Sequence, residues 1–511
     1  MKKIFYIVLS LVLSTAMIAC YKDKGNYNYD ANELITIKGL EKGYSKLSMI
    51  ERLQIDPEVS SSMPGAQLEY LWRMYEYPIE GVRPKMVTIG TEKKLDYLVE
   101  NDAREWVLLL TVTNKKTGFA QTFETRLNVA TNYTQGWYVL KSDNNQSDID
   151  LFKTPENIFP GIQIENVFSK VNNRKLAGNA TLLQYYNNYK NRTSDGKSEN
   201  VNTLFALTDK DGSAVRLNTM TELRSFGKFF WDYPAVMAPG FLFEGGYGKY
   251  VVNDGSLYGI FSFNINYGTF GARILADNKN RPYSLNQFYL TNFVSLPVMF
   301  DDVSSSFMTA DLNSPYMYEY GDADGTSMPA AKNNQRLLFM GQASTFPFKG
   351  YAVMQDKTDP NIKVVASIEP TSSKLKITTS PILPGQKLFN ARLHTLINNS
   401  ENLLYFVTGN ELYSRGLSSG VEELQFKAPE GETITFIRHR WYTASLDPAY
   451  KFDYVMVGTT SGGKYKVRMF KKQAGSLVTT PDFILEGNGE PRDVIYISPR
   501  MRPSQEIINS Y

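Results

Sequence analysis

The chain contains one cysteine and two histidines in 511 residues. A single cysteine excludes disulfides within the chain, so the stability of the fold must come from hydrophobic cores, which a chain of this length can supply. The two histidines, His394 and His439, leave little material for histidine-based catalysis, and we interpret both as structural or surface residues. No long amphipathic helical pattern is present, which favours an all-β protein.

Excess charge of either sign is also absent. The chain has 55 basic and 52 acidic residues, and removing Lys2 and Lys3 with a signal peptide would leave 53 against 52. Nucleic-acid binding usually needs a clear basic excess, so no nucleic-acid partner is expected. The sequence also lacks the usual short motifs of zinc, redox, phosphate-binding and serine-hydrolase sites. No catalytic residue, metal ligand or cofactor is therefore predicted.

The one cysteine, Cys20, follows a short apolar segment that two lysines precede. Residues 4–13 are too few to span a bilayer, and small residues lead up to Ala19, as in a secretory signal peptide. The tetrad Met17-Ile18-Ala19-Cys20 resembles a lipobox, with Met where Leu is usual. We expect signal-peptide removal after residue 19 and acylation of Cys20 with diacylglycerol and palmitate-type chains, which anchor the protein to the bilayer. An ordinary secretory signal or a short anchor helix is the alternative.

Residues 20–32 are polar and include Gly25, which predicts a flexible tether. Residues 33–131 predict a small β domain. Strand patterns occupy residues 34–37, 68–74 and 106–113, and the turn at residues 114–118 leads into a returning strand over 119–129. Short strands around a central Trp72 indicate an immunoglobulin-like sandwich.

Two segments of this region resemble the PKD domain. Tyr70-Leu71-Trp72 matches its Y-x-W pattern, and residues 106–114 match Y-x-L-x-L-x-V-x-N with Trp106 in place of Tyr. The glycine–aspartate turn typical of PKD domains is missing after Trp72. Together with Cys20 and the tether, these segments make the chain similar to the PKD-like lipoproteins of Bacteroidota.

The polar segment 131–135 is a plausible domain boundary, and residues 135–511 read as a second β domain. Apolar strand, polar turn and second strand recur seven times over residues 136–511, about 54 residues per repeat, near the period of propeller repeats. The starts are Gly136, Leu204, Lys249, Val298, Leu337, Leu403 and Phe452. We predict a β-propeller of about seven irregular blades, with a pair of β-sandwiches as the alternative.

Aromatic residues form 13% of the chain, mostly Tyr and Phe. Such rings suit β-sheet packing, and in loops they suit the faces of sugars or the apolar side chains of peptides. Two insertions, residues 178–202 and 313–336, are expected to be long loops. The candidate ligand-binding residues are Trp231, Tyr233, Arg440, Trp441, Tyr185 and Tyr186.

Carboxylates near strand ends could serve a glycosidase, since that chemistry needs only two of them. We interpret them instead as acceptors of backbone N–H groups in turns. They are Asp209, Asp254, Asp301, Asp302 and Asp356. Asp322 and Asp324 lack the further carboxylates of a calcium loop and are interpreted as part of a solvated turn.

The resemblance implies an accessory lipoprotein of SusC/SusD-type nutrient importers, attached to the outer membrane and exposed at the cell surface. The propeller would bind an oligosaccharide or oligopeptide without covalent chemistry and pass it to the transporter. A purely structural subunit of the transporter complex is one alternative. A surface hydrolase whose carboxylates line the propeller channel is another.

Overall fold

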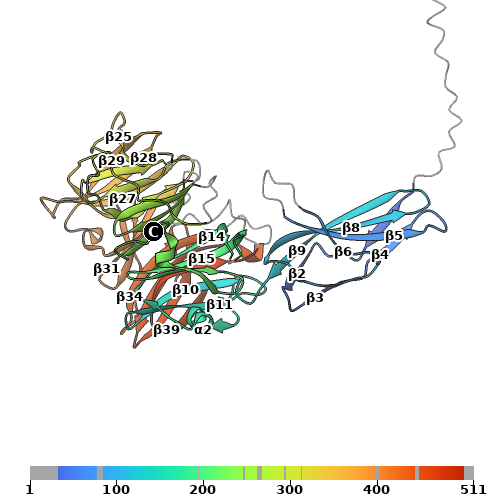
Figure 1. Ribbon diagram of the computed structural model, residues 1–511. Coiled ribbons are helices and arrows are strands. Elements are labelled where there is room, and N and C mark those ends of the chain that lie inside the picture. Colours follow the sequence, from blue (N-terminus) through green and yellow to red (C-terminus); the bar gives the residue numbers. More distant parts are fainter. Residues whose placement is uncertain are drawn as a thin grey trace, which may run out of the picture. The chain divides into compact units, whose positions relative to one another are not determined.

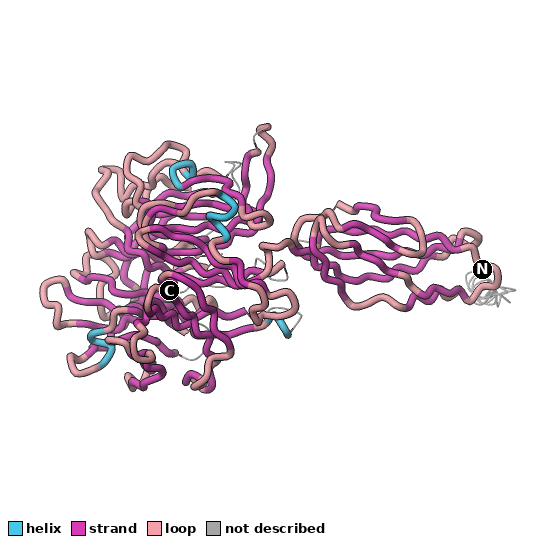
Figure 2. Tube along the Cα trace, turned by 90° about the horizontal axis from the view of Figure 1, so that it is seen from below, coloured by secondary structure: helices cyan, strands magenta, loops and turns pink. Residues whose placement is uncertain are grey.

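The computed structural model describes residues 33–77, 85–193, 195–245, 248–261, 268–292, 295–311, 313–397, 402–442 and 448–499. The predicted signal peptide, the tether and the acylation site Cys20 lie outside these residues. Nearly all of the described chain is strand or loop, and helix is confined to a few short segments (Figure 2). No helix in the described part of the chain is long and apolar enough to cross a bilayer.

The first nine strands form a sheet of five strands and two strand pairs. The five-stranded sheet has the order β2 (Gly43–Leu47), β9 (Ala120–Ala130), β8 (Arg104–Asn114), β5 (Leu68–Glu76) and β6 (Val87–Gly90). The pairs are β1 (Ile35–Lys38) with β4 (Glu58–Ser61), and β3 (Arg52–Ile55) with β7 (Leu95–Leu98). The predicted β8–β9 hairpin is confirmed.

Trp72 lies at the centre of this domain. Its side chain is fully buried, as are those of Leu53, Met74 and Leu110, and its indole N–H donates to the carbonyl of Glu92 (3.0 Å). A buried tryptophan needs such a partner because an unpaired N–H in an apolar core is costly. The Y-x-W segment therefore supplies the core residue that the sequence indicates.

The remaining described strands form seven larger sheets, which are the blades of a β-propeller (Figure 1). The first blade consists of β40 (Glu490–Ile497), β10 (Gly136–Asp143), β11 (Gln146–Lys153) and β12 (Gln163–Ile164), with β13 (Leu176–Ala177) beside β11. The second blade consists of β14 (Ala180–Arg192), β15 (Ser198–Thr208), β16 (Gly212–Arg216) and β17 (Thr221–Ser225). The short helix α2 (Val167–Asn172) lies between β12 and β13 in sequence, and η1 (Phe226–Phe229) follows β17.

The third blade consists of β18 (Pro239–Gly245), β19 (Gly248–Asn253) and β20 (Ser256–Phe261). The fourth blade consists of β21 (Leu285–Leu290), β22 (Val298–Asp301), β23 (Ser306–Ala310) and β24 (Met317–Glu319). The fifth is β26 (Gln335–Ser344), β27 (Lys349–Asp356), β28 (Lys363–Pro370) and β29 (Lys374–Ile382), with β25 (Gly321–Asp322) at its edge. A 3₁₀ turn, η2 (Lys387–Asn390), follows it.

The sixth blade consists of β30 (Leu393–Leu396), β31 (Leu403–Thr408), β32 (Glu411–Gly416) and β33 (Glu422–Lys427). The seventh blade consists of β34 (Thr433–Tyr442), β35 (Phe452–Ser461), β36 (Lys464–Phe470) and β39 (Phe483–Asn488). The 3₁₀ turn η3 (Pro448–Tyr450) precedes β35, and β37 (Lys472–Gln473) pairs with β38 (Ser476–Leu477). Each of the seven predicted repeat starts falls in a different one of these sheets, so the seven-bladed prediction is confirmed.

The blades close into a ring through their first strands. Contacts run from β40 to β14, from β14 to β18, from β21 through β26 and β30 to β34, and from β34 back to β40. Stacking of Phe243 on Tyr289 (4.5 Å between centroids) joins β18 to β21. The last strand, β40, pairs antiparallel with β10, so the two ends of the propeller chain share one blade (Figure 1).

Most of the aromatic side chains in the described part of the propeller are buried, as expected from their suitability for twisted sheets. Trp137, for example, is fully buried and lies within 4.7–6.3 Å of the rings of Phe452, Tyr454, Phe483 and Tyr496. Its indole N–H donates to the carbonyl of Ile158 (2.8 Å). These packed rings supply the stability that disulfides do not provide.

The prediction that residues 178–202 form a loop is wrong. Strands β14 and β15 continue through most of this segment and are joined by a turn that includes residues 195–196. The tyrosines of the segment lie in the strands, where Tyr186 and Tyr189 turn inward onto Phe205. The polar residues between them misled the interpretation, because a long hairpin alternates inward and outward side chains.

Candidate functional site

An exposed aromatic loop, residues 230–238, connects η1 of the second blade to β18 of the third. Trp231 and Tyr233 are 72% and 69% exposed, whereas most other aromatic side chains of the propeller are buried. Val236 and Met237 of the same loop are also exposed. A cluster of apolar side chains in solvent is costly for a protein that has no use for it, so it indicates a contact surface. We call residues 231–237 the aromatic platform.

Backbone hydrogen bonds hold both ends of the aromatic platform. Trp231 N–H donates to the carbonyl of Phe270 (2.8 Å), and Phe270 N–H donates to the carbonyl of Phe229 (2.7 Å). At the other end, the side chain of Asn253 donates to the carbonyl of Val236 (2.8 Å) and accepts from Ala238 N–H (2.9 Å). The rings are therefore presented on a fixed backbone, which lowers the entropy lost on binding.

Tyr233 rests on Gly227. A Cβ atom built at Gly227 would lie 2.2 Å from Cε2 of the Tyr233 ring, so only glycine allows the ring this position. The hydroxyl of Tyr233 lies 3.4 Å from the sulfur of Met237. Tyr233 is thus packed on one side and open on the other, while Trp231 two residues earlier remains mostly in solvent.

This arrangement suits the apolar face of a sugar or an apolar side chain of a peptide. Each ring offers a flat apolar surface, and Tyr233 and Trp231 add polar edges. The exposed carboxylate of Asp232 between them can accept hydrogen bonds from ligand hydroxyls. The structure thus brings together the two predicted residues Trp231 and Tyr233, and adds Val236 and Met237. The sequence signal for Val236 and Met237 is that they lie on the same short segment as Trp231.

The prediction of ligand contact is wrong for Tyr186. This side chain is fully buried, and its hydroxyl donates to the carbonyl of Phe243 (2.9 Å). Burial raises the pKa of Tyr186 well above its ordinary value. Its neighbour Tyr185 is half-buried and packs against the core formed by the first two blades. Both belong to blade packing, because β14 is the first strand of its blade.

The prediction is also wrong for Arg440. Its side chain is 3% exposed, and its guanidinium donates to the carbonyl of Val494 (3.2 Å) and to the carboxylate of Asp493 (3.2 Å). Trp441 follows it on β34, half-buried, with no hydrogen bond to its indole N–H within the described residues. These residues lie in a strand of the seventh blade rather than in a loop, so they do not extend the aromatic platform.

The two histidines are buried, in agreement with the structural interpretation. His439 Nε2 lies 2.7 Å from Asp453 Oδ1, and the Lys472 amine lies 2.6 Å from the same oxygen. Burial lowers the pKa of His439, although Asp453 opposes this. His394 stacks on Phe339, and burial together with Lys363 lowers its pKa to about 3. Both imidazoles are therefore neutral at pH 7.

Of the five carboxylates near strand ends, Asp209, Asp301 and Asp356 accept from backbone N–H groups, as the sequence analysis favoured. Asp301 accepts from the backbone N–H of Ser284 and of Val303 and pairs with Arg281 (3.1 Å). Asp356 accepts from the N–H groups of Thr358 and Asp359. Asp209 accepts from the backbone N–H of Asn179, whereas Asp302 accepts from the side-chain amide of Asn286. Asp322, which the sequence analysis assigned to a solvated turn, accepts from the backbone N–H of Ala330.

Comparisons with known proteins place the N-terminal part of the chain in a family model. Residues 20–180 match the PKD-like family, which covers the first nine strands and reaches into the first blade. No curated protein matches the chain.

Solved structures similar to this chain are distant from it in sequence. A quinonprotein alcohol dehydrogenase-like protein from Bacteroides thetaiotaomicron is 15% identical, with 89% of this chain and 96% of that chain covered and a TM-score of 0.37. Hsv2 from Kluyveromyces lactis is 8% identical, with 72% and 100% covered and a TM-score of 0.36. The WD40 domain of SCAP from fission yeast is 10% identical, with 62% and 74% covered and a TM-score of 0.31.

Proposed function

We propose that this protein is a lipid-anchored nutrient-binding protein of the outer-membrane surface, which captures oligosaccharides on its aromatic platform. The observation that carries the proposal is the exposure of Trp231 and Tyr233 on a loop fixed at both ends. The rings of Trp231 and Tyr233 provide stacking surfaces, and the carboxylate of Asp232, which separates them in sequence, provides a hydrogen-bond acceptor for sugar hydroxyls.

The anchor and the partner complete the proposal. Acylation of Cys20 holds the chain at the membrane, and the tether of residues 20–32 gives it reach. The captured ligand passes to an importer of the SusC/SusD type, and the protein itself carries out no covalent chemistry. The match of residues 20–180 to the PKD-like family supports the family resemblance on which the transporter partner rests.

Binding of glycans to the full-length protein in detergent tests the ligand. Titration of surface oligosaccharides into the wild type should give saturable binding, and Trp231→Ala and Tyr233→Ala should each weaken it at least tenfold. Tyr318→Ala is the matched control, since Tyr318 is 48% exposed on a different blade and should leave affinity unchanged. Equal loss in the control, or peptide binding instead of glycan binding, would contradict the proposal.

Copurification from the native outer membrane tests the partner. A transporter and its lid lipoprotein recovered in stoichiometric amounts with the tagged, lipidated protein support the proposed role. The exposed apolar side chains of the aromatic platform also fit a protein partner, and this favours a second candidate, a structural subunit of the transporter complex. In that case Trp231→Ala would abolish copurification, whereas no oligosaccharide would bind the wild type.

A further inference from the structure

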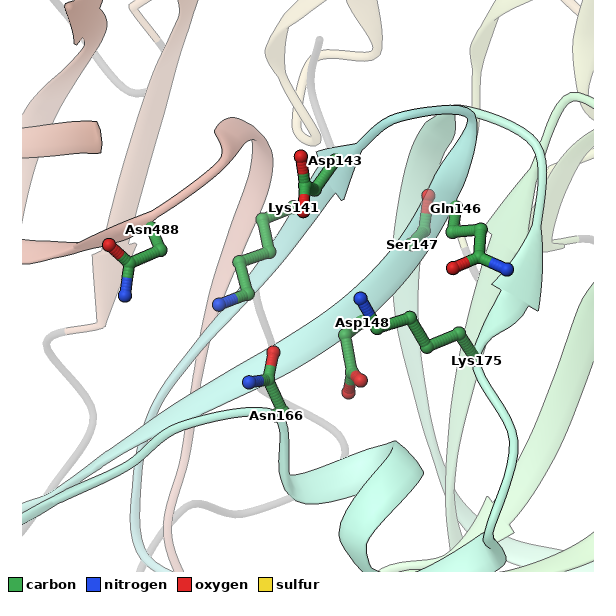
Figure 3. Close-up of a pocket in the computed structure, with 8 residues that line it drawn as sticks. All are labelled: Lys141, Asp143, Gln146, Ser147, Asp148, Asn166, Lys175 and Asn488. Carbon is green, nitrogen blue, oxygen red and sulfur yellow. The ribbon is translucent and has the colours of Figure 1, made fainter. Parts of the chain in front are cut away.

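A small polar pocket lies in the first blade, away from the aromatic platform in sequence (Figure 3). Its volume is about 80 Å³, and its walls come from the β10–β11 hairpin, the segment around α2 and the end of β39. The lining side chains include Lys141, Gln146, Asp148, Asn166, Lys175 and Asn488. All of them carry hydrogen-bonding or charged groups, so a ligand of this pocket must be strongly polar.

One charged pair beneath the pocket is already satisfied. The Lys141 amine lies 2.8 Å from Asp150 Oδ1, and both side chains are almost fully buried. Asp150 also accepts from Asn166 N–H (2.8 Å) and from the hydroxyl of Tyr465 (2.8 Å). Every oxygen of Asp150 therefore has a partner, and the positive charge of Lys141 is neutralised within the protein.

The neighbouring carboxylate, Asp148, is only half satisfied. It stands directly across the strand pair from Lys141, but the Lys141 amine reaches past it to Asp150. Asp148 Oδ1 accepts from Ile149 N–H (2.8 Å) and Ser169 N–H (3.2 Å). Asp148 Oδ2 has no hydrogen-bond partner, although the residue is 97% buried (3% exposed) and lines the pocket. A buried acceptor left open to a polar pocket points to a donor that the protein itself does not provide.

A free cation lies beside this acceptor. Within the described residues, the Lys175 amine has no ion pair or hydrogen bond, and Figure 3 shows its side chain extending toward Asp148 across the pocket. Its amine is not within ion-pair distance of Asp148. The pocket therefore presents an open carboxylate oxygen and an open ammonium group side by side, with the amides of Gln146, Asn166 and Asn488 around them.

We propose that this pocket binds a small zwitterion, a free α-amino acid, whose ammonium group donates to Asp148 Oδ2 and whose carboxylate accepts from Lys175. The two charges of an α-amino acid lie next to each other, as do the open Asp148 oxygen and the Lys175 ammonium group of the pocket. A single water occupies about 10–15 Å³ on the same measure of volume, so about 80 Å³ admits several waters or one molecule of a few heavy atoms. The amino acids that fit best have the smallest side chains.

Other small ligands match the pocket less well. Divalent cations want several oxygen or nitrogen ligands, and no group of three carboxylates or imidazoles in the described residues is placed to hold one. A simple anion would be repelled by Asp143 and Asp148, and a simple cation held by these carboxylates would leave the Lys175 ammonium group without a partner. The pocket has no aromatic wall for a sugar ring to stack on.

Calorimetric titration of glycine into the full-length protein in detergent tests this inference. The wild type should bind one glycine per chain with a dissociation constant of about 1 mM or tighter. Asp148→Asn keeps the shape and the oxygen that accepts from Ser169, and should weaken binding at least tenfold. Lys175→Met should weaken it similarly. Glu423→Gln, an exposed carboxylate on β33, is the matched control and should leave affinity unchanged.

Close analogues of glycine test whether the ammonium group and the carboxylate are both needed for binding. Glycine betaine has both charges but no N–H donor and should not bind, and acetate or methylamine alone should not bind. No saturable glycine binding at about 10 mM overturns the inference, as does equal affinity in Asp148→Asn. Binding of glucosamine without binding of glycine also overturns it. Oligosaccharide binding at Trp231 should survive in Asp148→Asn, which shows that the variant is folded.

Discussion

Arg440 on β34 and Asp493 on β40 form a buried ion pair, with Nη2 and Oδ1 3.2 Å apart. Asp493 also accepts from Leu183 N–H of β14 (2.8 Å) and lies 3.5 Å from the guanidinium of Arg438. One carboxylate thus joins the first strands of three consecutive blades. These are the blades where the two ends of the propeller chain meet.

Removing this carboxylate should destabilise the propeller strongly. Asp493→Ala leaves two guanidinium groups without their buried partner, and the expected loss is about 3–5 kcal/mol in the free energy of unfolding. Urea denaturation followed by tryptophan fluorescence measures it. Arg492→Ala on the same strand breaks only an exposed pair with Glu490 and should cost about 0–1 kcal/mol. Similar losses in the two variants would show that the buried cluster has no special weight.

Truncation of Trp137 should lower the stability of the protein strongly, whereas truncation of Trp231 should leave it nearly unchanged. Trp137→Ala removes a fully buried ring and the hydrogen bond to Ile158, so about 3–5 kcal/mol of stability should be lost. Trp231→Ala removes a ring that is mostly in solvent and should change stability by no more than about 0.5 kcal/mol. Thermal unfolding of both variants checks this. A large loss in Trp231→Ala would indicate packing rather than ligand contact.

Gly227→Ala tests whether displacing the Tyr233 ring lowers glycan affinity as much as removing the ring does. The added methyl group occupies the space of the ring, so Tyr233 must leave its place on the aromatic platform. Glycan affinity should fall about as much as in Tyr233→Ala, whereas an exposed ring can move at little cost in stability. Parallel titration of the two variants measures the effect. Unchanged glycan affinity in Gly227→Ala would mean that the ring position is unimportant.

Stability should fall as the pH decreases below 6.5. The unfolded chain protonates His394 near pH 6.5, but in the folded protein burial and Lys363 hold the pKa near 3. Between these values the unfolded state binds a proton that the folded state excludes, so up to about 1.4 kcal/mol is lost per pH unit. His439, whose pKa is also lowered, adds to this dependence. Urea midpoints measured from pH 7 to pH 4 should show the slope.

The variant His394→Phe isolates the contribution of this histidine. Phenylalanine preserves the stacking on Phe339 and removes the titrating group, whose Nε2 has no partner in the described residues. The pH dependence should become shallower, with the remaining slope arising from His439 and, near pH 4, from carboxyl groups with a lowered pKa such as Glu432. An unchanged slope would show that His394 does not titrate in this range.

Replacement of Cys20 should release the protein from the membrane. Cys20→Ala removes the thiol that we propose accepts the lipid, so the protein should shift from the membrane fraction to the soluble fraction. Metabolic labelling with palmitate should mark the wild type and not the variant. A variant that remains in the membrane fraction would favour the alternative of an N-terminal anchor helix.

The fold was predictable because its signals are repeated and local. Alternating apolar residues and polar turns placed β8, β9 and one strand in each of the seven blades. The hairpin of β14 and β15 was missed because polar residues on the outward face of a long strand resemble a loop. Ring closure by β40 has no local signal, since its partner β10 lies at the other end of the propeller chain.

The candidate sites were predictable only in part. Trp231 and Tyr233 were found because prolines and a short polar break surround them. Arg440 looks the same in sequence as an exposed arginine, and only the position of Asp493 in space shows that it is buried. The pocket was missed, although Lys141, Asp148 and Asp150 interrupt two otherwise apolar strands. Charged residues at such positions are a usable signal, since burying them requires partners.

The pairing of β40 with β10 has a consequence for biosynthesis. The first blade has no inner strand until nearly the whole chain has been made, so every earlier length of the chain exposes the open edge of β10. An unpaired edge can add strands from other chains. Synthesis therefore yields an open, association-prone arc that becomes a ring only in its last step, and a chaperone that covers this edge would prevent association before the ring closes.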